Sequence, residues 1–142
     1  MTSHRTVAKL PLVRGAIGVI ERNGRVLIAQ RWRGVHLAEL WEFPGGKRRA
    51  GESATACLRR ELQEELGVTV RVGASLGELR YDYPTRRIRL AVHRCRIIVG
   101  TPRALGSAAV RWVPLGRLAE YEFPPANAPL LRLLNTCPPL QC

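Results

Sequence analysis

The chain has 142 residues, 46% of them hydrophobic, which is enough to build one domain with its own core. With 23 Lys and Arg against 11 Asp and Glu, the net charge is +12, so anionic ligands are favoured over cationic ones. No apolar run approaches the roughly 20 residues of a membrane span, and residues 1–9 lack the apolar centre of a secretion signal. We therefore expect a soluble, cytoplasmic protein with no membrane partner.

The predicted strands are separated by turns that contain Gly or Pro. In chain order, extended segments are predicted over residues 15–21, 26–30, 41–43, 68–72, 76–83, 87–99 and 108–113. Asn23-Gly24 joins the first two as a hairpin. Helices are predicted over residues 53–66, 115–121 and 128–135. Strands from distant parts of the chain around one central helix, with a further helix at the end, predict a mixed sheet between helices.

The central predicted helix carries a cluster of acidic side chains. Ser53 can act as its N-cap, and Gly67 stands where a left-handed residue ends a helix. At about 100° per residue, Glu61, Glu64 and Glu65 fall within an arc of about 100°. A hard divalent cation such as Mg²⁺ takes oxygen ligands of this kind. The alternative is a solvated acidic face that binds nothing.

The segment before this helix favours a cation site. Gly45-Gly46 allows close approach of the backbone and unusual backbone angles. The basic residues Lys47, Arg48 and Arg49 follow directly. A glycine-rich, basic loop that leads into a carboxylate-bearing helix suits an anionic, metal-bound ligand such as a nucleotide polyphosphate.

Residues 46–68 resemble the Nudix box at each of its fixed positions. These are Gly46, Glu52 and the run Arg60-Glu61-Leu62-Gln63-Glu64-Glu65-Leu66-Gly67-Val68. Nudix enzymes hydrolyse nucleoside diphosphates linked to another group, and they use Mg²⁺ or Mn²⁺. The resemblance therefore implies a diphosphatase with the Nudix fold, an α/β/α sandwich with a mixed sheet. It covers about residues 12–135 of a single domain, 1–142.

The resemblance also implies roles for individual residues of the box. Metal binding falls to four residues, namely the main-chain carbonyl of Gly45 and the carboxylates of Glu61, Glu64 and Glu65. Glu61 and Glu64 would be catalytic, with Glu61 accepting the proton of the attacking water. Glu52 and Arg60 would form an ion pair that ties the loop to the helix.

Three further stretches resemble the MutT branch, which hydrolyses oxidised guanine nucleotides such as 8-oxo-dGTP to the monophosphate and pyrophosphate. They are Trp41-Glu42-Phe43-Pro44-Gly45-Gly46-Lys47, Tyr81-Asp82-Tyr83-Pro84 and Phe123-Pro124-Pro125-Ala126-Asn127. The resemblance implies five substrate-binding residues: Arg31, Phe43, Lys47, Arg86 and Asn127. Arg31 would hold a phosphate, and Asn127 would contact the oxidised base, because an amide offers both a donor and an acceptor. Capping of the final helix is the alternative role of Asn127, and a place on the ordinary surface is the alternative for Arg31 and Arg86.

One position departs from the MutT pattern. That pattern places a glutamate just before the tryptophan of the last strand, whereas this chain has Arg111 before Trp112. Either the helix carboxylates suffice, or another acid takes the place of this glutamate. Glu120 and Glu122 are the candidates nearest in sequence.

Two other functions remain open at this point. One is a MutT-like pyrophosphohydrolase that acts on CTP or other nucleotides. The other is a nucleic-acid recognition module, because the C-terminal domain of the adenine glycosylase MutY resembles MutT and reads oxidised guanine in DNA. Such a module does not need the box carboxylates that this chain retains. We expect a monomer with a small nucleotide substrate and no obligate nucleic acid, although the charge of +12 favours non-specific binding.

The cysteines show no spacing typical of a zinc site. They are Cys57, Cys95, Cys137 and Cys142, and they are expected to be free thiols.

Overall fold

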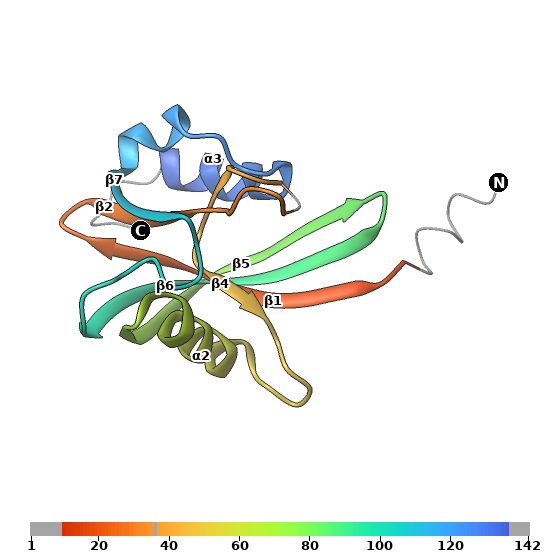
Figure 1. Ribbon diagram of the computed structural model, residues 1–142, viewed down its shortest axis with the longest axis horizontal. Coiled ribbons are helices and arrows are strands. Elements are labelled where there is room, and N and C mark those ends of the chain that lie inside the picture. Colours follow the sequence, from red (N-terminus) through yellow and green to blue (C-terminus); the bar gives the residue numbers. More distant parts are fainter. Residues whose placement is uncertain (1–9, 36, 137–142) are drawn as a thin grey trace.

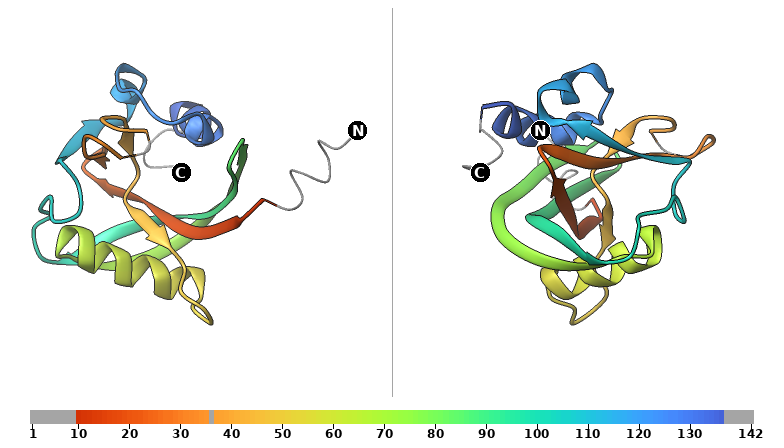
Figure 2. Two further views of the ribbon diagram at one scale, coloured as in Figure 1. Left: turned by 45° about the vertical axis from the view of Figure 1, so that its right-hand side comes forward. Right: turned by 90° about the vertical axis from the view of Figure 1, so that its left-hand side faces the viewer.

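A computed structural model of the protein describes residues 10–35 and 37–136. Its layers form an α/β/α sandwich with a mixed sheet in the middle, as predicted (Figure 1). Helix α2 (Ala54–Leu66) covers one face of the sheet. Helix α3 (Ala128–Thr136) covers the other face, together with two short 3-10 helices, η1 and η2. The two rotated views show the same separation of the helical layers (Figure 2).

The long strand β1 (Leu12–Arg22) runs through the centre of the sheet. It pairs in parallel with β6 (Arg86–Val99), from Leu12 opposite Arg87 to Ile20 opposite Cys95. The other edge of β1 pairs with the short antiparallel strand β4 (Gly45–Lys47). Beyond β6 lies β5 (Thr69–Tyr83), which forms a long, curved antiparallel hairpin with it.

The last part of β1 joins a second group of strands. Asn23 and Gly24 have φ angles of 51° and 75°, which form the predicted tight turn into β2 (Arg25–Gln30). Strand β2 pairs with β3 (Trp41–Glu42) on one edge and with β7 (Ala109–Pro114) on the other. The strand order is therefore β3-β2-β1-β6-β5, with β4 added to β1 and β7 added to β2.

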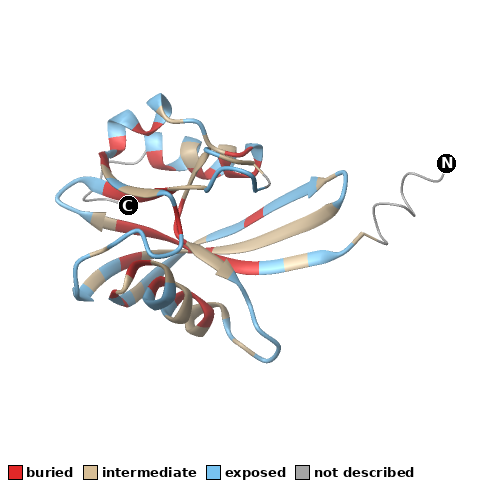
Figure 3. Cartoon of the chain, in the orientation of Figure 1, coloured by how far each residue is buried: buried red, intermediate tan, exposed pale blue. Residues whose placement is uncertain are grey.

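Apolar side chains from both faces of the sheet form two buried clusters. Figure 3 marks the buried positions of the chain in red. On one face, the leucine stripe of α2 packs against Ala16, Ile20 and Leu27. On the other face, side chains from the sheet pack against the C-terminal helices, and this cluster includes Phe43, Val92, Val113, Leu118, Leu130 and Leu134. Burial of an apolar stripe on each side holds the three layers together.

Both ends of α2 are capped by the residues that the sequence predicts. Ser53 has an extended backbone, and its hydroxyl oxygen accepts a hydrogen bond from the Ala56 N–H at 3.1 Å. Gly67 is left-handed at φ 71°, and its N–H donates to the Gln63 carbonyl oxygen at 3.0 Å. The Ser53 cap fixes the start of the helix beside the loop that precedes it, and Gly67 fixes its end.

The prediction of two strands over 68–72 and 76–83 was wrong. The structure has one strand, β5, because both segments pair with the same partner, β6. The register shifts between Val72 and Ser75 and again between Ser75 and Gly77. These bulges absorb the residues that interrupt the apolar pattern, so that the pairing continues past them.

Two further expectations concern membranes and thiols. In residues 10–35 and 37–136, no helix is long and apolar enough to cross a membrane. Cys57 and Cys95 are buried free thiols, as predicted. Cys137 and Cys142 lie outside the described residues.

Candidate active site

The glycine loop is held closely between β1 and α2. Gly45 has a φ angle of 154°, and a Cβ atom there would collide with the carbonyl oxygen of Ala16. A Cβ atom at Gly46 would collide with the carboxylate of Glu61. Space therefore requires glycine at position 45, where the neighbour is backbone, whereas a side chain at position 46 would displace the Glu61 carboxylate from the loop.

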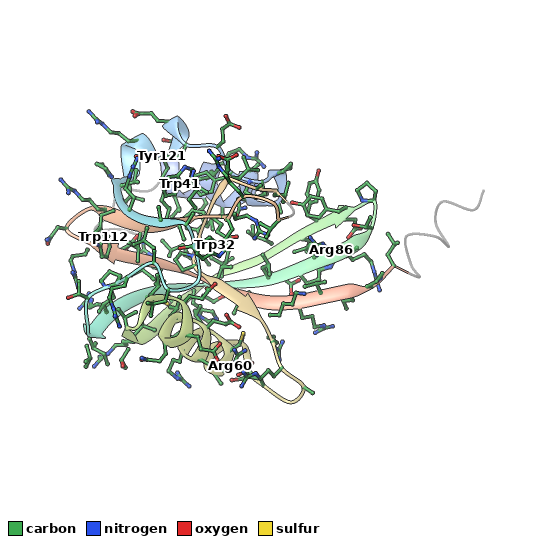
Figure 4. All side chains as sticks on the ribbon, viewed as in Figure 1. Trp32, Trp41, Arg60, Arg86, Trp112 and Tyr121 are labelled. Carbon is green, nitrogen blue, oxygen red and sulfur yellow. The ribbon has the colours of Figure 1, made fainter. Side chains whose placement is uncertain are left out.

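Arg60, on α2, connects the helix to the loop through several charged hydrogen bonds. The residue is labelled in Figure 4. Its Nε and Nη2 donate to the two carboxylate oxygens of Glu52 at 2.7 and 2.8 Å, which is the predicted ion pair in bidentate form. Nη1 donates to Glu61 at 2.8 Å, and Nη2 donates to the Lys47 carbonyl oxygen at 3.0 Å. The hydrogen bonds from Arg60 lower the pKa of Glu52 to about 2. Glu52 therefore stays ionised at neutral pH and fixes the loop.

The helix carboxylates differ in their surroundings. Glu65 accepts a hydrogen bond from the Gly45 N–H at 3.2 Å. Burial, followed by the negative charges of Glu61 and Glu42, raises the pKa of Glu65 to about 8. Glu64 is 49% exposed and lies 3.3 Å from Arg60. Three acidic side chains are thus concentrated at one end of the loop, as the helix periodicity predicts.

These carboxylates suit a hard divalent cation by their chemistry. They offer oxygen donors, and the buried Glu65 is surrounded by like charges that a cation would neutralise. Within the described parts of the chain, however, no three Asp, Glu, His or Cys side chains converge closely enough to hold one ion. Arg60 instead engages Glu61 and Glu64. Binding of a cation therefore requires these two side chains to turn away from Arg60.

A cavity of about 310 Å³ lies between the sheet and the C-terminal segment. It contains four of the five predicted substrate residues: Arg31, Lys47, Arg86 and Asn127. These residues come from the end of β2, from β4, from the start of β6 and from η2 (Pro125–Asn127). The Nε atom of Arg86 is buried and has no hydrogen-bond partner among the described residues. The fold thus gathers cationic and amide groups from distant parts of the sequence into one cavity.

Two further residues of this cavity were not assigned a role from the sequence, Glu42 and Tyr83. Glu42 accepts a hydrogen bond from Nη1 of Arg31 at 3.0 Å. Burial raises the pKa of Glu42, and the charge of Arg31 opposes this effect. Its charge also contributes to the raised pKa of Glu65, so Glu42 links the lining of this cavity to one carboxylate of α2. An acidic residue between two aromatic ones was the only sequence signal for this position.

Asn127 is 7% exposed and directly precedes α3. Its side-chain NH₂ donates a long hydrogen bond of 3.5 Å to the Pro124 carbonyl oxygen. Among the described residues, no N–H of the first turn of α3 donates to its side-chain oxygen, and Pro129 has no N–H to offer. This geometry does not support the helix cap, and it leaves the amide oxygen available to a ligand in the cavity.

The side chain of Phe43 does not line the cavity. It is 2% exposed and stacks on Phe123, with 5.2 Å between the ring centroids. Its position in β3–β4 directs the ring into the apolar core. Phe43 was among the predicted substrate-binding residues, and this burial leaves its main chain, rather than its ring, for that role.

Arg111 occupies an aromatic environment rather than an acidic one. Its guanidinium lies 5.2 Å from the centre of the Trp41 ring and 5.8 Å from that of Tyr121, and it donates to the Tyr121 hydroxyl at 3.3 Å. Figure 4 labels the two aromatic residues. Glu120 is 64% exposed and lies 3.9 Å from Arg117. Among the described acids outside the box, Glu42, rather than Glu120 or Glu122, contributes to the raised pKa of Glu65.

A carboxylate-bearing helix packed against a glycine-rich loop, together with a cavity that holds three cationic side chains, suits a phosphorylated substrate. Residues 16–133 match the model of the NUDIX domain, and the chain belongs to this family. It is a Nudix hydrolase, an enzyme class that generally uses divalent metal ions.

Relatives with curated names support the same class. The chain is 38% identical to the 8-oxo-dGTP diphosphatase of Haemophilus influenzae, across 87% of this chain and 93% of the relative. It is 34% identical to the CTP pyrophosphohydrolase of Escherichia coli, across 86% of this chain and 90% of the relative. The solution structure of the E. coli ORF135 protein has a TM-score of 0.74 at 34% identity and covers 88% of this chain and 89% of its own.

Proposed function

We propose that the protein is a Mg²⁺-dependent nucleoside triphosphate pyrophosphohydrolase whose substrate is 8-oxo-dGTP. The observation that carries this proposal is one cavity lined by Arg31, Lys47, Arg86 and Asn127. Its lining also includes Glu42, whose charge contributes to the raised pKa of Glu65 on the helix. The name of the H. influenzae relative, an 8-oxo-dGTP diphosphatase, supports the same substrate. Removal of this nucleotide from the pool would prevent its incorporation into DNA.

Three cationic residues are available for the triphosphate. Lys47 extends from β4 directly beside the glycine loop, so its ammonium group can reach phosphates held near α2. Nη1 of Arg31 donates to Glu42 at 3.0 Å, and the residue lines the cavity, where its positive charge can attract a phosphate. The buried Nε of Arg86 supplies a further donor. These groups neutralise the substrate charge as it enters the cavity.

The side-chain amide of Asn127 suits the base of the nucleotide. An oxidised guanine carries an N7–H donor and a C8 carbonyl, and the Asn127 amide offers an acceptor and a donor. Because Asn127 is buried, a base that leaves its amide unpaired binds less well. Selectivity for the oxidised base therefore rests on this residue.

Glu61 is the residue we assign to proton transfer. A water molecule attacks a phosphorus of the triphosphate, Glu61 accepts its proton, and the phosphoric anhydride bond breaks to give the monophosphate and pyrophosphate. When bound to the carboxylates, Mg²⁺ supplies positive charge against the phosphate oxygens and increases the acidity of water. The hydrogen bond from Arg60 at 2.8 Å keeps Glu61 oriented toward the loop before the cation binds.

The test is hydrolysis of a nucleotide panel with Mg²⁺, with Mn²⁺ and with EDTA. We expect activity only with metal, the highest kcat/KM for 8-oxo-dGTP, and pyrophosphate rather than orthophosphate as the first product. Water labelled with ¹⁸O identifies the phosphorus attacked, because the label enters one product only. Release of orthophosphate first, or full activity in EDTA, contradicts the proposed reaction.

CTP is the second candidate substrate, because the E. coli relative named a CTP pyrophosphohydrolase is 34% identical over most of both chains. The same panel decides between the two. A higher kcat/KM for CTP than for 8-oxo-dGTP replaces the proposed substrate but leaves the reaction unchanged.

A further inference from the structure

A second cavity, of about 370 Å³, lies at the far end of the β5–β6 hairpin. Its lining consists of Glu21, Arg71, Gly73, Arg94, Cys95 and Arg96. None of these residues lines the first cavity, which contains Arg31, Lys47, Arg86 and Asn127 and is called the nucleotide cavity below. Arg86 of the nucleotide cavity and Arg94 are eight residues apart in β6, which corresponds to about 26 Å along an extended strand. The second cavity is therefore separate from the active site.

The arginines of this cavity share one face of the sheet. Arg94 and Arg96 alternate with Cys95, which packs with the α2 cluster, so their side chains lie on the opposite face. Arg71 stands directly opposite Arg96 in the β5–β6 register. Side chains at directly opposite positions lie on the same face of a sheet. Three guanidinium groups are thus placed next to one another.

The charges of this cluster are only partly compensated. Nη2 of Arg94 donates to Glu21 at 3.0 Å, and that is the one acidic side chain of the cavity. Among residues 10–35 and 37–136, no carboxylate lies within 4.0 Å of Arg71 or Arg96. Like charges directly opposite each other destabilise a sheet. With three arginines and one glutamate, the cavity keeps two uncompensated positive charges.

The backbone beside the cluster opens at a bulge. The register of β5 shifts between Val72 and Ser75, and Gly73 lies within that shift. The Nδ1–H of His93 donates to the Gly73 carbonyl oxygen at 3.1 Å, which fixes the bulge. Arg94 is only 17% exposed, and its Nε is buried without a hydrogen-bond partner in the described chain. The guanidinium of Arg94 is thus fixed by Glu21 and keeps one N–H donor without a partner in the described chain, whereas Arg71 and Arg96 are exposed. The end of β6 is drawn mainly in pale blue and tan in Figure 3.

We propose that Arg71, Arg94 and Arg96 form a second phosphate-binding site outside the active site. A phosphate group accepts hydrogen bonds from several guanidinium forks at once, and its charge removes the repulsion between Arg71 and Arg96. Its ligand is either a small polyphosphate, such as the pyrophosphate that the proposed reaction releases, or the backbone of a single-stranded nucleic acid. The site exists in the fold whether or not the proposed substrate is correct.

The test compares the wild-type protein with two double variants of equal charge. Arg71→Gln/Arg96→Gln removes the unpaired arginines of the site. Arg59→Gln/Arg132→Gln removes two exposed arginines from α2 and α3 that line neither cavity. Both variants keep every residue of the nucleotide cavity, so binding there is the same in all three proteins. Titration calorimetry with pyrophosphate in EDTA forms one arm, and fluorescence anisotropy with a labelled single-stranded oligonucleotide forms the other.

We expect the site variant to lose at least ten-fold in affinity for one of the two ligands, while the control variant loses less than three-fold. Loss in the pyrophosphate arm alone identifies a small polyphosphate as the ligand, and loss in the oligonucleotide arm identifies a nucleic acid. Equal affinities in the site and control variants, in both arms, overturn the proposal. Melting curves in low salt check the fold, because relief of the repulsion should leave the site variant at least as stable as the wild type.

Discussion

Replacement of Asn127 by alanine separates recognition of the base from support of the helix. Asn127 is 7% exposed, and its side-chain hydrogen bond within the described chain is a long one of 3.5 Å. A buried polar group of the substrate left without its partner costs roughly 1–3 kcal/mol. Since 1.36 kcal/mol corresponds to a factor of ten, Asn127→Ala should reduce the preference for 8-oxo-dGTP over dGTP by roughly 5- to 150-fold. The value of kcat/KM for dGTP itself should change much less.

The assay measures kcat/KM for both nucleotides and a melting curve on the same preparation. Asn135→Ala is the matched control, because this asparagine is exposed on α3, the helix that Asn127 precedes, and lines neither cavity. A helix-capping role makes a different prediction, namely a loss of about 1 kcal/mol of stability with an unchanged preference. If the preference is unchanged while the melting temperature falls, Asn127 has no part in base recognition and our reading of the cavity is wrong.

Three further predictions concern the loop and the helix. Glu61→Gln should lower kcat by at least about 100-fold, as expected for loss of a group that transfers a proton; near-full activity in saturating Mg²⁺ would remove Glu61 from this role. Gly46→Ala should abolish activity, because the added methyl collides with the Glu61 carboxylate. Gly116→Ala is the control and should be active, because a methyl there meets nothing within 4 Å. Equal activities of the two variants would show that the loop is not packed as described. The pKa of Glu52 is lowered to about 2 from a usual 4.5, so its contribution to stability is complete above pH 4.5 and is lost as the pH falls toward 2. Denaturant unfolding from pH 5 to 2 should therefore show a weaker pH dependence for Glu52→Gln than for the wild type, and identical slopes would contradict the ion pair with Arg60.

The parts of the site that the sequence predicts are those formed by neighbouring residues. The start and end of α2 follow from Ser53 and Gly67, because a cap acts within one turn of the helix. The placement of Glu61 and Glu65 on one face follows from the helical period. The pair of Arg60 and Glu52 came from the family resemblance, and the structure places it within the same loop and helix.

Other features depend on contacts between distant segments, and these were missed or wrong. Glu42 meets Arg31 only because β3 pairs with β2, and no local pattern marks that contact. The ring of Phe43 could face the cavity or the core, and only the position of Phe123, eighty residues later, decides for the core. Arg111 follows the alternation of β7, but its aromatic partners come from β3 and from the end of η1 (Leu115–Glu120). Pairing and packing across the sheet are therefore what the single sequence leaves open.

The parallel pairing of β1 with β6 also has a consequence for the order of folding. Leu12 pairs with Arg87 and Ile20 with Cys95, which in both cases is a partner 75 positions later in the chain. Closure of a loop of this length costs about 4 kcal/mol of chain entropy before any contact compensates for it. A nascent chain that has not yet reached residue 87 can form the β1–β2 turn and α2, but β1 then has a bare edge and the apolar stripe of α2 lacks part of its cover. Completion of β6 during synthesis is thus the event that commits this chain to its native sheet.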